Sequence, residues 1–178
     1  DAVEYQGRIF GMKSASFQPL LDLPRKTGAQ LELALGSETA PRALLSTKGW
    51  KLRDPLKVSR SLQSYQRYLQ QSKAEFAVAK QAYVAARSGW FSERSACYLA
   101  TGRPVIVQDT GFKNSIESGR GILAYATPEE AQANVIALDA DYHYHCSHAR
   151  DVAQSYFDAS VILERMIQEI FSQRPFAV

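Results

Sequence analysis

"SGWFSERSACYLATGRPVIVQDTG", residues 88–111, combines a turn, a helix, a short apolar strand and a polar loop in one stretch. Either Ser92 or Ser95 can cap the helix, which runs through Leu99 and ends at Gly102. The segment "PVIVQD" that follows is apolar on both faces, which is typical of a strand in a parallel sheet. The stretch therefore predicts a helix and a strand of an α/β fold, with polar residues beyond the carboxyl end of the strand.

Helix-like and strand-like segments alternate through the rest of the chain. Further strands are predicted at residues 29–36, 50–54, 74–79 and 121–126. Helices are predicted at residues 16–24, 37–49, 59–73, 127–138, 142–157 and 160–173. Pro24 is expected to end the first helix, Thr127 to cap the helix that Pro128 begins, and Ser160 to cap the last. In the helix at 59–73, an apolar stripe is predicted from Leu62, Tyr65 and Leu69.

This alternation predicts one Rossmann-like domain over residues 1–178, a doubly wound parallel sheet with helices on both faces. Residues 1–138 form its sheet core and residues 139–178 its long C-terminal helices. Ligands of such sheets bind beyond the carboxyl ends of the strands. The loops that we expect there are residues 36–38, 79–80, 89–94 and 108–112.

The composition limits the classes of protein to which the chain can belong. The 178 residues are 46% hydrophobic and 22% charged, which excludes a disordered chain. A net charge of +3 is too small for the dense basic face of a nucleic-acid-binding protein. No apolar run reaches the roughly 18 residues that span a membrane, and we expect no signal peptide. The two cysteines indicate a reducing compartment, with Cys97 as a buried thiol. We therefore expect a cytoplasmic protein that binds no nucleic acid and has no membrane span.

The loop at residues 89–94 is the strongest candidate for an anion site. Gly89 lets the backbone approach a ligand closely, and the helix N-terminus at Ser92 offers free N–H groups to a phosphate. Arg94 adds a bidentate cation, and Glu93 a carboxylate that accepts hydrogen bonds from ribose or sugar hydroxyls. Trp90 either stacks on a base or packs the loop. The alternative is an ordinary capped helix start with a solvated pair of charges.

Two further segments are weaker candidates on local grounds. Asp109, Thr110 and Gly111 follow the buried strand, but all three are also common turn residues. Arg8 and Lys13 flank Gly11 before a predicted helix, where two cations can neutralise a diphosphate. The alternative for this pair is surface charge.

The run "HYHCSH" is not expected to bind a metal. On a helix, His145 and His148 share a face that His143 does not join. No second ligand pair matches them, and a zinc site generally needs four fixed ligands. We expect exposed helix residues here and assign no metal or other cofactor.

A longer pattern resembles a known family. The residues "ACYLATGRPVIVQDTG" are similar to the C-terminal, donor-binding domain of GT-B fold glycosyltransferases, where a helix, a Gly-x-Pro-Val corner, a strand and a loop hold the nucleotide sugar. "GRIFGMKSASFQPLLDLP" is similar to the family's opening Arg-x4-Lys loop and helix, and "HARDVAQSYFDASVILERM" resembles its terminal helices. The resemblance covers nearly the whole chain and is strongest over residues 89–111.

The resemblance implies roles for particular residues. Arg8 and Lys13 would bind the donor phosphates, and Asp109, Thr110 and Gly111 would contact the donor, a nucleotide-diphosphate sugar that is the substrate. The family's Glu-x7-Glu pair falls on Gly89 and Cys97 here. Neither retaining nor inverting chemistry is supported, and no catalytic residue is assigned.

The resemblance also implies a second domain, because a GT-B active site lies between two Rossmann-like domains and this chain has room for one. We therefore expect a nucleotide-sugar-binding domain that is incomplete for catalysis without an acceptor domain or a partner chain. The alternative is a non-catalytic interaction module that self-associates through an apolar face. The nucleotide, the sugar and the acceptor stay open.

Overall fold

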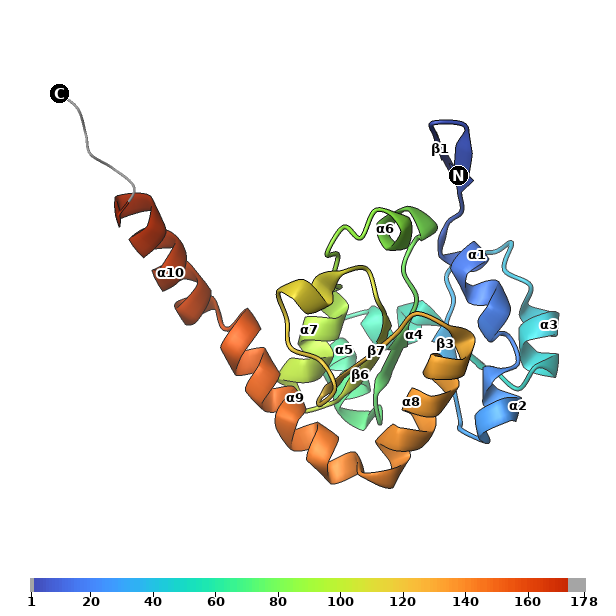
Figure 1. Ribbon diagram of the computed structural model, residues 1–178. Helices are drawn as coiled ribbons and strands as arrows, with labels where there is room; N and C mark the ends of the chain where they lie inside the picture. Colours follow the sequence, from blue (N-terminus) through green and yellow to red (C-terminus); the bar gives the residue numbers. More distant parts are fainter. Residues whose placement is uncertain (1, 173–178) are drawn as a thin grey trace.

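The strands of the protein lie in two parallel sheets and one hairpin, as the computed structural model of residues 2–172 shows (Figure 1). The larger sheet holds β5 (Glu75–Ala77), β6 (Val105–Gln108) and β7 (Ile122–Tyr125), parallel and in that order. The smaller sheet pairs β3 (Glu32–Ala34) with β4 (Lys51–Arg53), also in parallel. Because parallel strands need crossover connections, helices separate them along the chain.

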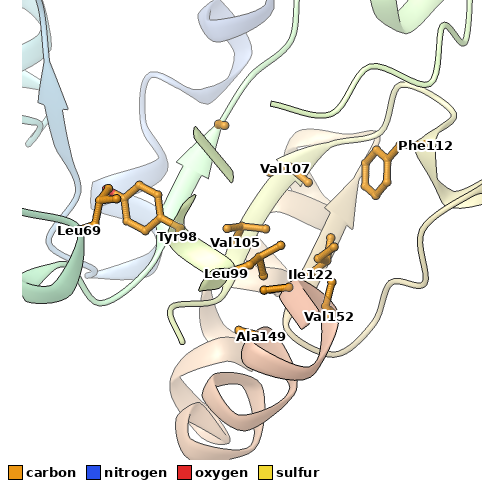
Figure 2. Close-up of a cluster of buried hydrophobic side chains, with 11 residues drawn as sticks. Leu69, Tyr98, Leu99, Val105, Val107, Phe112, Ile122, Ala149 and Val152 are labelled. Atoms are coloured by element: carbon orange, nitrogen blue, oxygen red, sulfur yellow. The ribbon is translucent and has the colours of Figure 1, made fainter. Parts of the chain in front are cut away.

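Alternate residues of the larger sheet are buried on opposite faces. Val105 and Val107 of β6 belong to a cluster with residues of α7 (Glu93–Ala100) and α9 (Tyr142–Phe157). Figure 2 shows this cluster, in which Leu69 and Tyr98 lie together at one side, away from Ile122 and Val152. The first face of the sheet is thus covered by α7 and α9.

The second face packs against another set of helices. Ile106 of β6 and Leu123 of β7 share a cluster with Ala131, Val135 and Leu138, whose spacing of four and three places them on one face of α8 (Pro128–Ala140). Trp50 joins the same cluster. Helices therefore cover both faces of the three-stranded sheet, as its apolar strands predict.

Shorter helices connect the remaining strands. Ahead of β3 lie α1 (Lys13–Phe17), the 3-10 helix η1 (Gln18–Leu20) and α2 (Leu23–Thr27), and α3 (Arg42–Thr47) joins β3 to β4. The connection from β4 to β5 contains α4 (Pro55–Ser59) and α5 (Leu62–Gln71). Between β5 and β7 the chain also forms α6 (Gln81–Ala85) and the 3-10 helix η2 (Phe112–Asn114).

Both ends of the described chain stand away from this body (Figure 1). Strands β1 (Val3–Tyr5) and β2 (Arg8–Phe10) form an antiparallel hairpin in which Val3, Tyr5 and Ile9 are exposed. At the other end, α10 (Ala159–Ser172) projects from α9 and has no buried residue. None of the helices within residues 2–172 combines the length and the apolar character that a membrane crossing requires.

The predicted mixed α/β architecture with parallel strands is confirmed, but one continuous doubly wound sheet is not seen. Within residues 2–172, β3 pairs only with β4, and β5 only with β6. The sequence pattern shows which segments are strands, whereas the edges along which they pair depend on packing between distant segments.

Several predicted boundaries are wrong for local reasons. Pro24 does not end a helix but lies in the first turn of α2, where its missing N–H costs no hydrogen bond. The last helix is capped by Asp158, whose Oδ1 accepts from the backbone N–H of Ser160 at 2.9 Å. Leu62 does not join an apolar stripe, because it is the first residue of α5 and is exposed. The predicted final residue, 173, lies outside the described residues.

Candidate functional site

Four loops meet beyond the carboxyl ends of β5 and β6. The loop before α1 is tied to α6, since the backbone N–H of Gln81 donates to the carbonyl of Gly11 at 3.1 Å and its side chain accepts from the N–H of Gly11. The loop before α7 is tied to the loop after β6, because Gly89 N–H donates to the Thr110 carbonyl at 2.9 Å. These bonds join the edge of the larger sheet to the first turns of α1 and α7.

The first turn of α7 presents a free backbone donor at this edge. Ser92 is its N-cap, and its hydroxyl accepts from the backbone N–H of Arg94 at 3.3 Å. Among the described residues, the backbone N–H groups of Glu93 and Ser95 have no hydrogen-bond partner, but Ser95 is fully buried, so that only the N–H of the exposed Glu93 can meet a ligand. This N–H group and the positive end of the helix dipole together favour an anion. Of the two predicted caps, Ser92 is the one that caps α7.

Three cations gather around this turn, and we call Lys13, Lys80 and Arg94 the basic cluster. Lys13 is the first residue of α1, and its Nζ lies 5.0 Å from the ring centroid of Trp90. Burial lowers the pKa of Lys13 below its usual 10.5, and the charge of Arg94 lowers it further, while the carboxylates of Glu75 and Glu93 oppose the shift. The lowered pKa therefore reflects the partial burial of the ammonium group more than its neighbours.

Arg94 is held in place by a buried carboxylate. Its Nε donates to Oε1 of Glu75 at 2.5 Å, and Glu75, the first residue of β5, is only 4% exposed. The pKa of Arg94 is raised, since Glu75 outweighs the effect of burial. The other guanidinium nitrogens make no hydrogen bond within the described residues, so they stay available to a ligand.

The three residues after β6 stabilise the loop rather than reach solvent. Thr110 is fully buried and its hydroxyl donates to the carbonyl of Trp90 at 2.6 Å. Asp109 accepts from the N–H of Gly111 at 2.8 Å and pairs with Lys113 at 2.9 Å. Gly111 is itself buried. Direct contact between a ligand and Thr110 or Gly111 is therefore not available in this conformation.

The structure separates the predicted pair of cations. Lys13 lies at the edge described above, whereas Arg8 lies on the exposed hairpin, where its guanidinium covers the ring of Phe10 at 5.2 Å. Gly89 has a φ of +74° and open space around its α-carbon, and Glu93 is exposed at the start of α7. The structure thus brings together Lys13, Gly89, Ser92, Glu93 and Arg94 but not Arg8.

Sequence reasoning missed Glu75 and Lys80 as parts of this site. Lys80 lies three residues after the end of β5, in a loop that the strand pattern does indicate. Glu75 offers only one signal, a carboxylate at the start of an apolar strand, which is unfavourable to bury unless a cation pairs with it.

Two expectations for other residues are wrong. His145 is buried, not exposed, and its Nδ1 accepts from the N–H of Gly121 at 3.4 Å, while burial lowers its pKa. Cys97 is exposed, because it lies on the outer face of α7. Within residues 2–172, His, Cys, Asp and Glu form no group of three that could hold a metal ion.

Comparisons with protein-family models, with curated proteins and with solved structures give no match.

Proposed function

We propose that this chain is a nucleotide-sugar-binding domain of glycosyltransferase type that needs a second, acceptor-binding part for full catalysis. One observation carries the proposal. Lys13 lies against Trp90 beyond the carboxyl ends of parallel strands, within reach of the charges of Lys80 and Arg94, and the free N–H of Glu93 begins α7 nearby. The side chain of Arg94 turns back toward Glu75 at the amino end of β5. The carboxyl ends of parallel strands are where α/β sheets bind ligands, and a diphosphate is the ligand that several cations and a helix N-terminus favour together.

The groups around the cluster suit the remainder of such a donor. The ring of Trp90 lies beside Lys13 and against Tyr83, with ring centroids 5.3 Å apart, and offers a flat surface to a base. Glu93 is exposed beside the first turn of α7 and can accept hydrogen bonds from ribose hydroxyls. At Gly89 the space where a β-carbon would lie is open, so a ligand can approach the backbone there.

The contribution of this chain to transfer is electrostatic. When the bond between the sugar and the diphosphate breaks, the leaving nucleoside diphosphate takes the electron pair and gains negative charge. Lys13, Arg94 and the α7 dipole stabilise that charge. We assign no general base to this chain. A purified protein that transferred sugar to an acceptor at an ordinary enzymatic rate, without a partner, would contradict the two-part proposal.

A binding panel tests the proposal. Thermal shift and titration calorimetry with nucleoside diphosphates and their sugars should show one nucleotide that stabilises the protein in a concentration-dependent manner. Lys13→Gln should weaken that binding about tenfold, the loss expected for one charge-assisted contact to phosphate. The matched control is Lys26→Gln, since Lys26 lies on α2 and outside the basic cluster.

Two results would count against the proposal. The first is the absence of binding across the whole panel at millimolar ligand, which would leave an interaction module as the better description. The second is equal binding by Lys13→Gln and Lys26→Gln, because a diphosphate held elsewhere would not distinguish these two lysines.

A further inference from the structure

Two strand edges without a partner line the same groove. Within residues 2–172, β3 pairs only with β4 and β5 only with β6, so each strand has one unpaired edge. A groove of about 830 Å³ lies between the two sheets, lined by residues 29–34 on one side and 72–76 on the other. We call it the inter-sheet groove. Unpaired edges are normally covered, because they attract a further strand.

The pairing pattern shows which backbone groups point into the groove. The backbone N–H of Glu75 donates to the carbonyl of Pro104 at 3.1 Å, so the backbone N–H and C=O of Glu75 face β6. Those of its neighbour Phe76 face away from β6, because the direction alternates along a strand. On β3, Leu35 donates to Arg53 at 3.2 Å, so Ala34 points away from β4. Backbone groups of Phe76 and Ala34 thus remain unused at the two edges.

One wall of the groove is apolar. It is formed by side chains of β5, β6, α8 and the residue before β4, which all belong to the core on the second face of the sheet: Trp50, Phe76, Ile106, Val135 and Leu138. Side chains of an occupant that point this way must therefore be apolar.

The opposite wall is polar and holds a carboxylate oxygen that lacks a partner. Oε1 of Glu75 binds Arg94, but Oε2 is buried and makes no hydrogen bond within the described residues. Beside it, Glu32 pairs with Arg53 at 2.8 Å and accepts from the Tyr68 hydroxyl at 2.9 Å. A buried carboxylate oxygen without a donor is unfavourable, so an occupant with a hydrogen-bond donor here is favoured.

The order of elements also favours a strand in this position. Helices α1 and α2 lead into β3, and such helices are the usual connection between two neighbouring parallel strands. Yet the hairpin ahead of them is antiparallel and pairs with neither sheet. The free edge of β3 is therefore the one beside which a preceding parallel strand would normally lie.

We propose that the inter-sheet groove binds one extended strand of a partner polypeptide, parallel to β3 and β5, which joins the two sheets into one. Its side chains alternate between apolar residues that face α8 and hydrogen-bond donors that face Glu75. This proposal does not require that a nucleotide sugar binds, since it rests on the strand edges; the two sites share only the pair formed by Glu75 and Arg94.

Amide exchange measured by NMR on the wild-type protein tests this proposal. The probe is a synthetic peptide of about six residues that alternates threonine with valine, the length of an ordinary strand. The control peptide has the same side chains but is N-methylated at alternate residues, which removes backbone donors. With the first peptide, the amides of Ala34 and Phe76 should exchange at least about tenfold more slowly, as new hydrogen bonds require. The amides of Leu33 and Ala77, which face the existing partner strands, should not change.

Either of two results would overturn it. In one, the amides of Ala34 and Phe76 are already as protected as those of Leu33 and Ala77 without peptide, so that the edges are not free. In the other, a saturating concentration of the first peptide protects them no more than the N-methylated control does, so that no strand is added.

Discussion

Gly111 illustrates how a single residue sets the geometry of the loop after β6. Its φ is +90°, and a β-carbon at this position would lie 2.9 Å from the carbonyl oxygen of Arg87. Only glycine adopts this backbone conformation readily, and only glycine fits here. The pattern Asp-Thr-Gly, which the resemblance links to a donor contact, is therefore explained by the loop itself.

A pair of glycine substitutions tests this explanation. Gly111→Ala should lower the free energy of unfolding by about 3 kcal/mol, through backbone strain and the clash with Arg87. Gly89→Ala, at a φ of +74° with open space around it, should cost only about 1 kcal/mol. Urea denaturation measures both values. Equal losses would mean that the contact with Arg87 is not a constraint.

Lys13 gives the proposed binding a particular pH dependence. Its pKa is lowered by burial and by Arg94, so in the free protein it loses its proton at a lower pH than an ordinary lysine. The charged form is the one that binds an anion. The depressed pKa also means that protonated Lys13 disfavours folding, a penalty that is full below the folded-state pKa, shrinks as the pH rises above it and is gone above the ordinary value of 10.5.

We therefore expect the affinity for a nucleoside diphosphate to fall as the pH rises toward 10.5, beginning below that value. Binding at a pH near the lowered pKa should take up protons, because the anion restores the charge of Lys13. Calorimetry in two buffers of different ionisation enthalpy measures this uptake. In Lys13→Gln the uptake should disappear, and its persistence there would assign it to another group.

Helix ends explain why some elements are predictable from the sequence. The hydroxyl of Thr127 accepts from the N–H of Glu130 at 3.2 Å, and Glu130 in turn accepts from the N–H of Ala126 at 2.6 Å. This is close to the pattern that Thr127, Pro128 and Glu130 predict, because capping depends on residues only three apart. The same argument explains why the cap of α7 at Ser92 is predictable.

Replacement of the cap should destabilise the whole domain, since α8 covers one face of the sheet. Thr127→Ala should lower the free energy of unfolding by about 1 kcal/mol. Thr127→Ser is the control and should retain most of the stability, because it keeps the hydroxyl. The measurement is again urea denaturation, and indistinguishable values for the two variants would show that this hydroxyl does not cap α8.

The short elements were harder to predict. Helices α4 and α6 have five residues each, too few for an apolar periodicity to appear, and neither was predicted. The hairpin β1–β2 was expected as a loop, since its strands have three residues each and no buried side chain. Such elements depend on turns and neighbours more than on their own pattern.

Over the whole molecule, the sequence indicates most strands and long helices but not how the strands join. The apolar strands "EFA" and "VIVQ" predict a parallel sheet with two covered faces, and β5 and β6 form it. The separation between β3 and β5 has no local signal, because it depends on which edges pair. For the same reason, the sequence does not predict that Lys13 lies near Trp90 and Arg94, because these residues are distant along the chain. Ser92 and Gly89 are predictable as site residues because they lie in one short stretch.

The proposed site requires that a diphosphate binds at the first turn of α7, and the backbone amide of Glu93 reports on it. In a ¹⁵N-labelled sample titrated with nucleoside diphosphates, the signal of Glu93 should shift with the ligand concentration, while that of Ala131 in α8 should stay unchanged. The free N–H group of Glu93 is exposed and is the donor that phosphate would engage. If every diphosphate left the Glu93 signal in place at millimolar concentration, the nucleotide-sugar proposal would be wrong.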